Sequence, residues 1–265
     1  NLPDDFVSES IEGLVNSYPN TYKYSNITNK VLVRAKKALN KVGLVSGGGS
    51  GHLPLFTGYI GEGLLDSCAI GNVFASPSVD EISTAIKEAD SGKGVLCIYG
   101  NYGGDVMNFD MASEMLEMED IKVESVVVAD DVASAPKEEK EKRRGVTGML
   151  YVYKIAGAMA ETGASFDEVK RIAIKTNENI RTMGIALTPT ILPQAGKPTF
   201  EIADDEMEIG MGIHGEPGIR RGKLKSADEI TNELSDKILD DINLSSGDEI
   251  SVLINSLGAT PHEEL

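Results

Sequence analysis

Short apolar runs alternate with amphipathic segments over the first two thirds of the chain. One apolar run leads into the glycines after Ser46, a second spans Gly94 to Tyr99, and a third spans Lys122 to Asp131. Their length and flanking glycines are typical of buried strands. The segments between and after them have the apolar spacing of helices, at residues 80–92, 110–120, 145–163 and 166–179. This alternation predicts an α/β fold with a mostly parallel sheet.

The pattern changes near Met183, where several prolines interrupt a loop-rich passage. Beyond it, residues 206–218 are predicted as a strand that enters a turn, and residues 248–258 as a late strand. We therefore expect two α/β domains: residues 1–179, with glycine loops at strand ends, and a smaller second domain over residues 180–265. A capping-box pattern in residues 260–263 starts a helix where the chain stops. We expect both ends to be cut, so that the second domain is truncated.

Composition narrows the classes of function. The chain has 265 residues, and 41% of them are hydrophobic, which is enough for a sizeable core. The net charge of -17 would repel nucleic acid and anionic membranes. No apolar run approaches the roughly 18 residues of a membrane span, and no signal peptide is visible. Cys68 and Cys97 lie in apolar runs without metal-ligand spacing, which indicates reduced core residues of a cytoplasmic protein.

The stretch SGGGSGH, from Ser46 to His52, is the densest cluster of glycines in the chain. It lacks the Lys-Ser/Thr ending of a phosphate loop, and a dinucleotide fingerprint starting at Gly47 fails at its sixth position. We therefore expect no nucleotide or other cofactor site in this loop. Glycines at a strand end let a ligand contact backbone N–H groups, whereas a turn without a ligand needs only one glycine. These glycines favour a ligand-binding loop.

Two further polar residues could join this loop. Asp105 follows a glycine pair after the next buried strand. It could cap a helix that begins near Val106, or it could face His52 as an acid/base pair. His214 lies in GIHGEPG, where small neighbours leave its ring uncovered. It could be a nucleophile or base, or it could only hydrogen-bond its own turn.

The remaining polar clusters favour no chemistry. Asp130 and Asp131 end a strand, but no His or further acid has metal-ligand spacing to them, so we expect no metal site. His262 lies in the first turn of a helix at the end of the chain and receives no role. Residues 137–144 carry charges of both signs, which is typical of a solvated loop or helix.

Several stretches share their residues and their order with one known family. They are GLVSGGGSGH, FASP, NYGGDVMNF, VVADDVA, RRGVTG, AGKPTF, MEIGMGIHGEPGI and LINSLGATP. Together they resemble the dihydroxyacetone-binding subunit of dihydroxyacetone kinase over nearly the whole chain. The resemblance is most specific in SGGGSGH and GIHGEPG.

The resemblance implies a role for each candidate residue. In that family a histidine ring nitrogen attacks the carbonyl carbon of the ketose and forms a covalent hemiaminal, and this histidine corresponds to His214. A His and an Asp position and activate the hydroxyl that receives the phosphoryl group, and they correspond to His52 and Asp105. The implied substrate-binding residues are Gly48, Gly49, Ser50, Gly51, Phe74 and Gly100.

The resemblance also implies the partners. This chain would hold no cofactor, and ATP or ADP with Mg would bind to a separate nucleotide-binding kinase subunit. In the bacterial form that subunit is recharged by the phosphotransferase system. The chain would be a cytoplasmic homodimer that contacts neither nucleic acid nor membrane.

Three positions depart from the family. Leu53 replaces a Glu, Phe56 replaces a His or Cys, and Gly100 replaces a Lys that hydrogen-bonds the substrate. Three interpretations stay open. The chain could be an ordinary kinase subunit, or a subunit for a larger ketose, since replacing Lys by Gly adds room. It could also be a silent paralogue that binds dihydroxyacetone as a signal and acts as coactivator of a transcription factor.

Overall fold

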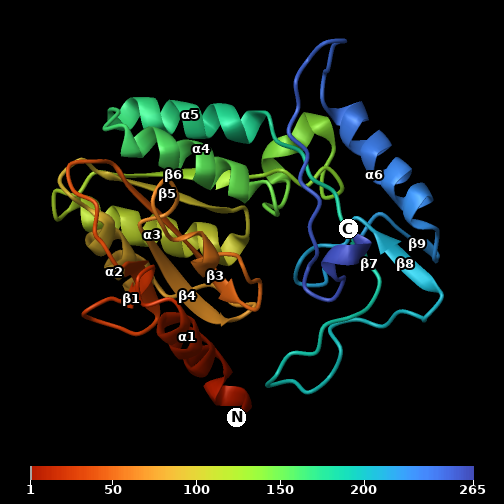
Figure 1. The fold of residues 1–265 in the computed structure, drawn as a ribbon, viewed down its shortest axis with the longest axis horizontal. Helices are drawn as coiled ribbons and strands as arrows, with labels where there is room; N and C mark the ends of the chain where they lie inside the picture. The colour runs from red at the N-terminus through yellow and green to blue at the C-terminus, as the bar shows by residue number, and fades with distance from the viewer. Residues whose placement is uncertain (1) are drawn as a thin grey trace.

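The computed structural model describes residues 2–265 and contains two separate sheets (Figure 1). The larger sheet has six strands in the order β1-β2-β4-β3-β5-β6. Their bounds are β1 Tyr22–Tyr24, β2 Val31–Arg34, β3 Gly43–Ser50, β4 Ser67–Val73, β5 Val95–Gly100 and β6 Val123–Val128. The helices of this part are α1 Phe6–Ser17, α2 Val79–Ala89, α3 Gly103–Glu117, α4 Met149–Glu161 and α5 Phe166–Glu178.

The pairing of these strands confirms the predicted α/β class. β4, β3, β5 and β6 run parallel, while β1 and β2 add an antiparallel hairpin beside β4. Strand residues alternate between two apolar cores. Leu44 and Leu96 pack on the side of α4 and α5, whereas Val45 and Val95 pack on the side of α2 and α3. Helices thus cover both faces, which is why the parallel strands are nearly continuous apolar runs.

The smaller sheet lies apart from the larger one, on the right of Figure 1. Its strands β7 Ile185–Ala186, β8 Glu206–Ile209 and β9 Arg220–Lys223 are all antiparallel, and α6 Ala227–Asp241 follows them. This differs from the α/β pattern that we expected for the second unit, because no helical crossover separates β7, β8 and β9. The two sheets lie on either side of residue 180, where the domain boundary remains a prediction.

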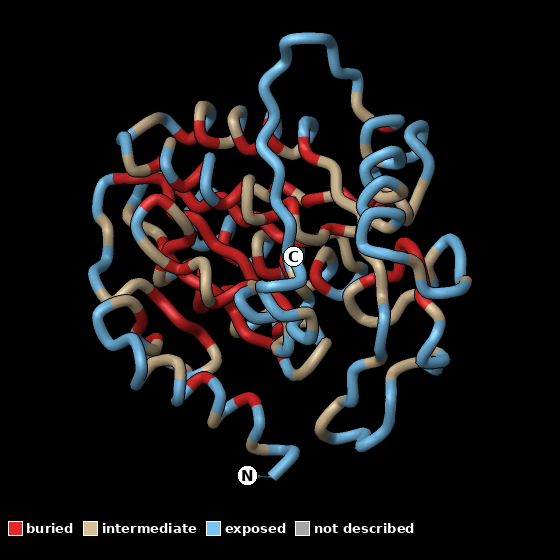
Figure 2. Tube along the Cα trace, turned by 45° about the vertical axis from the view of Figure 1, so that its right-hand side comes forward, coloured by how far each residue is buried: buried red, intermediate tan, exposed pale blue. Residues whose placement is uncertain are grey.

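The predicted strand at residues 248–258 is wrong. The structure has no strand there, and this segment runs across the molecule as an exposed stretch of irregular chain (Figure 2). Its apolar positions Ile250, Val252 and Ile254 are 60%, 71% and 61% exposed. Apolar alternation marks a strand only where a neighbouring strand supplies hydrogen bonds, and this segment pairs with none among residues 2–265.

The charged segment at residues 137–144 is only partly solvated. Residues Lys137–Lys142 form an exposed turn of 3-10 helix, as a solvated segment would. Arg143, however, is 1% exposed, and its guanidinium donates to both carboxylate oxygens of Asp241 at 2.9 and 2.6 Å. This ion pair joins α6 to the strand-end loops of the larger sheet, a long-range contact that local charge patterning does not reveal.

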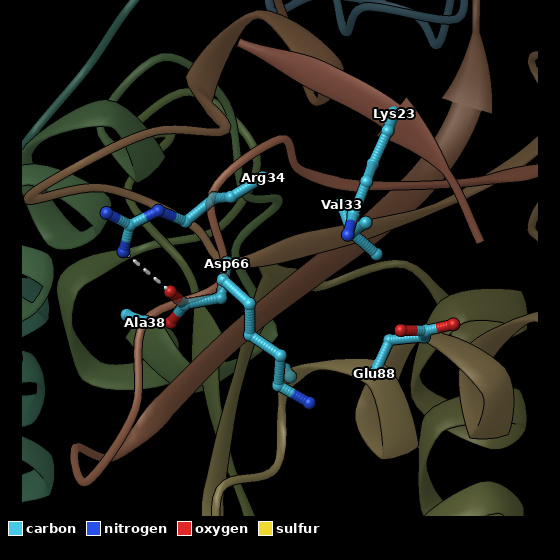
Figure 3. Close-up of a pocket in the computed structure, with 8 residues that line it drawn as sticks. Lys23, Val33, Arg34, Ala38, Asp66 and Glu88 are labelled. Carbon is cyan, nitrogen blue, oxygen red and sulfur yellow. Dashed lines mark hydrogen bonds and ion pairs between the residues drawn. The ribbon is translucent and has the colours of Figure 1, made fainter. Parts of the chain in front are cut away.

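A second ion network stabilises the opposite end of the larger sheet, where β3 and β4 begin. Asp66 accepts hydrogen bonds from the Arg34 guanidinium at 2.9 Å, the Lys41 ammonium at 2.5 Å and the Leu44 backbone N–H at 2.9 Å. Figure 3 shows Arg34 and Asp66 in the small pocket beside this network. This pocket lies at the amino ends of the parallel strands, away from the carboxyl ends where ligands of such sheets bind.

Among residues 2–265, every helix is too short or too polar to cross a membrane.

Candidate active site

The candidate site lies at the carboxyl ends of β3, β4 and β5. The strand order places β4 and β5 on opposite sides of β3. The ladder between β3 and β5 stops at Val45 and Cys97, whereas the ladder between β3 and β4 continues to Ser50. The end of β3 is therefore unpaired on its β5 side. Such a switch point forms the crevice in which open α/β sheets bind ligands.

Gly47, Gly48 and Gly49 of SGGGSGH belong to β3 and not, as predicted, to a loop after it, whereas Gly51 lies in the turn that follows. A Cβ atom on Gly48 would lie 2.1 Å from the ring of Phe56, and one on Gly49 would lie 2.6 Å from the backbone nitrogen of Ala75. Real Cβ atoms do not approach so closely. These glycines therefore let Phe56 and the turn after β4 pack directly on the strand, and those two segments flank the site.

His52 follows β3 through Gly51, whose φ of 98° suits glycine. Its ring stacks on Phe74, with ring centroids 4.5 Å apart and planes 13° apart. Phe74 has a φ of 55°, which is unusual for a bulky residue. Its backbone N–H donates to the Ser50 carbonyl at 3.0 Å, which ties this turn to the end of β3. The turn after β4 thus fixes the His52 ring.

His214 reaches the same place from the smaller sheet, on the loop after β8. Its Nε2 lies 3.0 Å from the Nε2 of His52. Tyr102 and Phe74 also face the His214 ring, with centroid distances of 4.8 and 5.3 Å. The small sequence neighbours of His214 predicted an uncovered ring, but in the structure the ring is partly covered. Its side chain is 26% exposed because side chains from distant segments surround it.

Glu216 is a site residue that sequence reasoning missed. Its carboxylate accepts hydrogen bonds from Nδ1 of His214 at 3.0 Å and from the His214 backbone N–H at 2.9 Å. Burial raises the pKa of Glu216, but the hydrogen bonds from His214 outweigh it and lower the pKa to about 2. The acid two residues after the histidine in GIHGEPG was the available signal.

Asp105 lies in the first turn of α3 and is not its N-cap, which was one of the two interpretations left open. The helix begins at Gly103, so its N-cap is Tyr102. Asp105 is 6% exposed, and its Oδ1 has no hydrogen-bond partner among the described residues. Burial raises the pKa of this carboxyl group, and nearby Ser76 and His214 offset the rise only in part. A buried carboxylate with a free oxygen is suited to accept a proton.

Burial, and then the neighbouring His214, lower the pKa of His52 to about 4. His52 is therefore neutral near pH 7, and its ring can donate one hydrogen bond and accept another. The structure thus brings His52 and His214 into contact, and Asp105 lies close enough to His214 for their charges to interact.

Gly100 has close neighbours in this structure. It is buried at the end of β5, and a Cβ atom there would lie 3.1 Å from the Tyr102 ring and 3.2 Å from the Gly145 carbonyl oxygen. Tyr102 and Gly145 thus lie directly against the position that a Cβ atom would take. Leu53 is 64% exposed, whereas Phe56 is buried against β3.

Asp130 and Asp131 organise loops beside the site. Asp130 is fully buried and accepts hydrogen bonds from two backbone N–H groups and the Thr182 hydroxyl. Asp131 pairs with Arg144, which also donates to the Gly210 carbonyl oxygen at 2.9 Å. Arg144 thus holds the loop of His214 against the end of β6. Residues 2–265 contain no group of three or more His, Cys, Asp or Glu that could hold a metal ion.

A fold of this kind, with a two-histidine site at its switch point, has known relatives. The sequence model of the Dak1 domain matches residues 12–265, and the chain belongs to this family. It is 47% identical over 98% of its length to the dihydroxyacetone-binding subunit DhaK of the PTS-dependent dihydroxyacetone kinase of Lactococcus lactis, and covers 78% of that protein.

Two solved structures are similar as well. The dihydroxyacetone kinase of C. freundii superposes with a TM-score of 0.86 at 36% identity, over 92% of this chain and 45% of that one. The dihydroxyacetone kinase operon co-activator Dha-DhaQ superposes with a TM-score of 0.81 at 36% identity, over 88% of this chain and 71% of that one. The solved structures of a kinase and of a co-activator are thus about equally similar to this chain.

Proposed function

We propose that this chain is the dihydroxyacetone-binding subunit of a dihydroxyacetone kinase. It holds dihydroxyacetone, or a closely related ketose, as a covalent hemiaminal on His214 for phosphoryl transfer from a separate nucleotide-binding subunit. The contact between His214 and His52 at 3.0 Å, with Asp105 close enough for its charge to interact with His214, carries this proposal. The 47% identity to a subunit named for dihydroxyacetone binding supports the substrate.

Each residue has a distinct task in this reaction. His214 bonds to the carbonyl carbon, which fixes the ketose in register for transfer and is chiefly a proximity effect. Asp105 takes the proton from the terminal hydroxyl as its oxygen attacks the phosphorus of the donor. Its raised pKa suits this task. His52, which is neutral, holds the attacking hydroxyl by a hydrogen bond.

The covalent bond explains selectivity for so small a substrate. A ligand of about six heavy atoms gains at most roughly 9 kcal/mol from non-covalent contacts. A bond to the carbonyl carbon discriminates a ketose from glycerol, which has no carbonyl. We assign the surrounding contacts to Gly48, Gly49, Ser50, Gly51, Phe74 and Gly100.

The partners follow from the same proposal. ATP or ADP with Mg binds to the partner subunit and not to this chain, and the phosphotransferase system supplies the phosphoryl group, as the relative's name PTS-dependent indicates for that protein. We further propose a cytoplasmic homodimer, with a ketose-binding domain over residues 1–179 and a second domain that carries His214 over residues 180–265.

One alternative has its own support. The similarity to the co-activator Dha-DhaQ favours a silent paralogue that binds dihydroxyacetone as a signal and contacts a transcription factor. Leu53 and Gly100, which depart from the kinase pattern, favour it as well. The acidic chain would not contact DNA itself in this role.

Phosphoryl transfer separates the two functions. The chain is mixed with a nucleotide-binding kinase subunit from a relative, its phosphodonor protein and dihydroxyacetone, and the phosphate ester is measured. The kinase proposal predicts an ester whose formation requires this chain. Ketose binding without any ester would contradict the kinase and support the co-activator.

A further inference from the structure

We propose that Glu216 is a positioning residue that fixes the tautomer of His214, so that Nε2 is the nitrogen that bonds to the ketose. This inference rests on the proposed function of the site and adds to it the group that prepares the nucleophile. The evidence for the inference is the set of hydrogen bonds inside the loop after β8.

The Glu216 carboxylate contacts both N–H groups of His214. Oε1 lies 3.0 Å from Nδ1 of the ring, and Oε2 lies 2.9 Å from the backbone nitrogen. An ionised carboxylate can only accept hydrogen bonds. Nδ1 therefore carries the ring hydrogen in this contact, and Nε2 retains its lone pair.

The loop is built to hold this carboxylate in place. The Gly212 N–H donates to the Glu216 carbonyl oxygen at 3.0 Å, and the Gly215 N–H donates to the Gly212 carbonyl oxygen at 3.0 Å. A Cβ atom on Gly212 would lie 2.2 Å from Oε2 of Glu216. Gly215 has a φ of 89°, which turns the chain back toward the histidine. Both glycines are thus needed for an acid to reach the ring two residues before it.

The contact on the other side of the ring agrees with this tautomer. A hydrogen bond between Nε2 of His52 and Nε2 of His214 requires that one nitrogen carries hydrogen and the other does not. With the His214 hydrogen on Nδ1, the His52 N–H donates and the lone pair of His214 accepts. The lone pair consequently faces His52, and the proposed substrate takes the place of this hydrogen bond when it bonds to Nε2.

The bond-forming step balances with this arrangement. The Nε2 lone pair forms the bond to the carbonyl carbon, the π electron pair of the carbonyl moves to its oxygen, and that oxygen takes a proton from solvent. The ring becomes an imidazolium, whose Nδ1–H stays hydrogen-bonded to the negative Glu216. A charged hydrogen bond of this kind is worth about 1.5–3 kcal/mol. Loss of it should weaken the adduct by roughly 10- to 100-fold.

The test combines two measurements on Glu216→Ala and Glu216→Gln, each first checked for native circular dichroism. Nitrogen-15 NMR of labelled histidine, recorded without any ketose, reports the tautomer of His214. Carbon-13 NMR of dihydroxyacetone labelled at its carbonyl carbon reports the affinity of the adduct. Glu201→Gln makes the same chemical change at an exposed position and serves as the control.

The proposal predicts a single Nδ1–H tautomer in the wild type and in the control. It predicts a mixture of tautomers in Glu216→Ala, together with the 10- to 100-fold weaker adduct. Glu216→Gln should lie between them, because an amide can accept only one of the two hydrogen bonds. If Glu216→Ala keeps the wild-type tautomer, the proposal is overturned, whatever happens to affinity. A tautomer that depends on Glu216 in a wild type that forms no adduct would support the positioning role and contradict the proposed function.

Discussion

Replacement of Gly49 by alanine tests whether β3 needs a bare backbone to build the site. The new Cβ would lie 2.6 Å from the nitrogen of Ala75 and 2.8 Å from the Cα of Phe74. Both are backbone atoms, and the turn that holds them is tied to Ser50 by the hydrogen bond from the Phe74 N–H. The turn cannot yield by a rotamer change, so the backbone must move.

Overpacking of this kind costs about 1–3 kcal/mol, and a clash with backbone belongs at the upper end of that range. We expect Gly49→Ala to unfold at a urea concentration lower by about 1 M, on the basis of a slope near 3 kcal/mol per molar. Movement of Phe74 also removes the ring on which His52 stacks. The ketose adduct should therefore weaken in the protein that remains folded.

Urea unfolding followed by circular dichroism measures the first effect, and carbon-13 NMR of the labelled ketose measures the second. Gly61→Ala is the matched control, since no atom lies within 4 Å of the Cβ position and the backbone does not have a positive φ. It should be neutral or more stable by up to about 1 kcal/mol. If Gly49→Ala unfolds and binds like the wild type, the packing argument for these glycines is refuted.

Three further predictions concern single side chains of the site. Asp105→Asn should keep the ketose adduct but lower the rate of phosphoryl transfer by about 100- to 10,000-fold, because the free carboxylate oxygen no longer takes the proton. The lowering of the His52 pKa from 6.5 to about 4 means that the unfolded chain binds a proton more readily than the folded one. Stability should therefore fall by up to about 3 kcal/mol as the pH drops from 6.5 through 4, and His52→Gln should remove this part of the loss. Arg144→Met leaves the buried Asp131 without its partner and frees Gly210, so urea unfolding should show a loss of about 3–5 kcal/mol.

Each of these has a control or a contrary result. Transfer at the wild-type rate by Asp105→Asn would exclude it as the base. A stability profile that is the same with and without His52 would show that other groups cause the acid loss. Arg171→Met breaks an exposed ion pair with Glu168 and should not change stability measurably. An equal effect of the two arginine variants would contradict the positioning role of Arg144.

The sequence predicted the class of the fold because its strongest signals are local. The apolar runs at β5 and β6 and the amphipathic pattern of α2 each indicate an element without knowledge of its neighbours. The hairpin of β1 and β2 was not predicted, and residues 248–258 were predicted as a strand that did not form. Both depend on whether another strand lies alongside, which periodicity within a segment does not report.

The candidate site likewise has features that the local sequence indicates and features that it does not. The glycine-rich motifs singled out His52, Asp105 and His214, which lie near one another in the structure, but their surroundings depend on contacts between distant residues. Phe74 covers the His52 ring from the turn after β4, and Glu216 reaches back to His214 only because Gly212 leaves room. A charged residue inside a solvated run, such as Arg143, likewise finds its partner nearly a hundred positions away.

The central claim is that His214 bonds covalently to a small ketose. Carbon-13 NMR of carbonyl-labelled dihydroxyacetone, mixed with the wild-type chain and with His214→Ala, tests it most directly. The claim predicts that the ketone signal of the bound molecule moves to the region of tetrahedral carbon in the wild type and that no such signal forms in His214→Ala. A bound ketone that keeps its carbonyl signal in the wild type, or a tetrahedral signal that survives in His214→Ala, would contradict it.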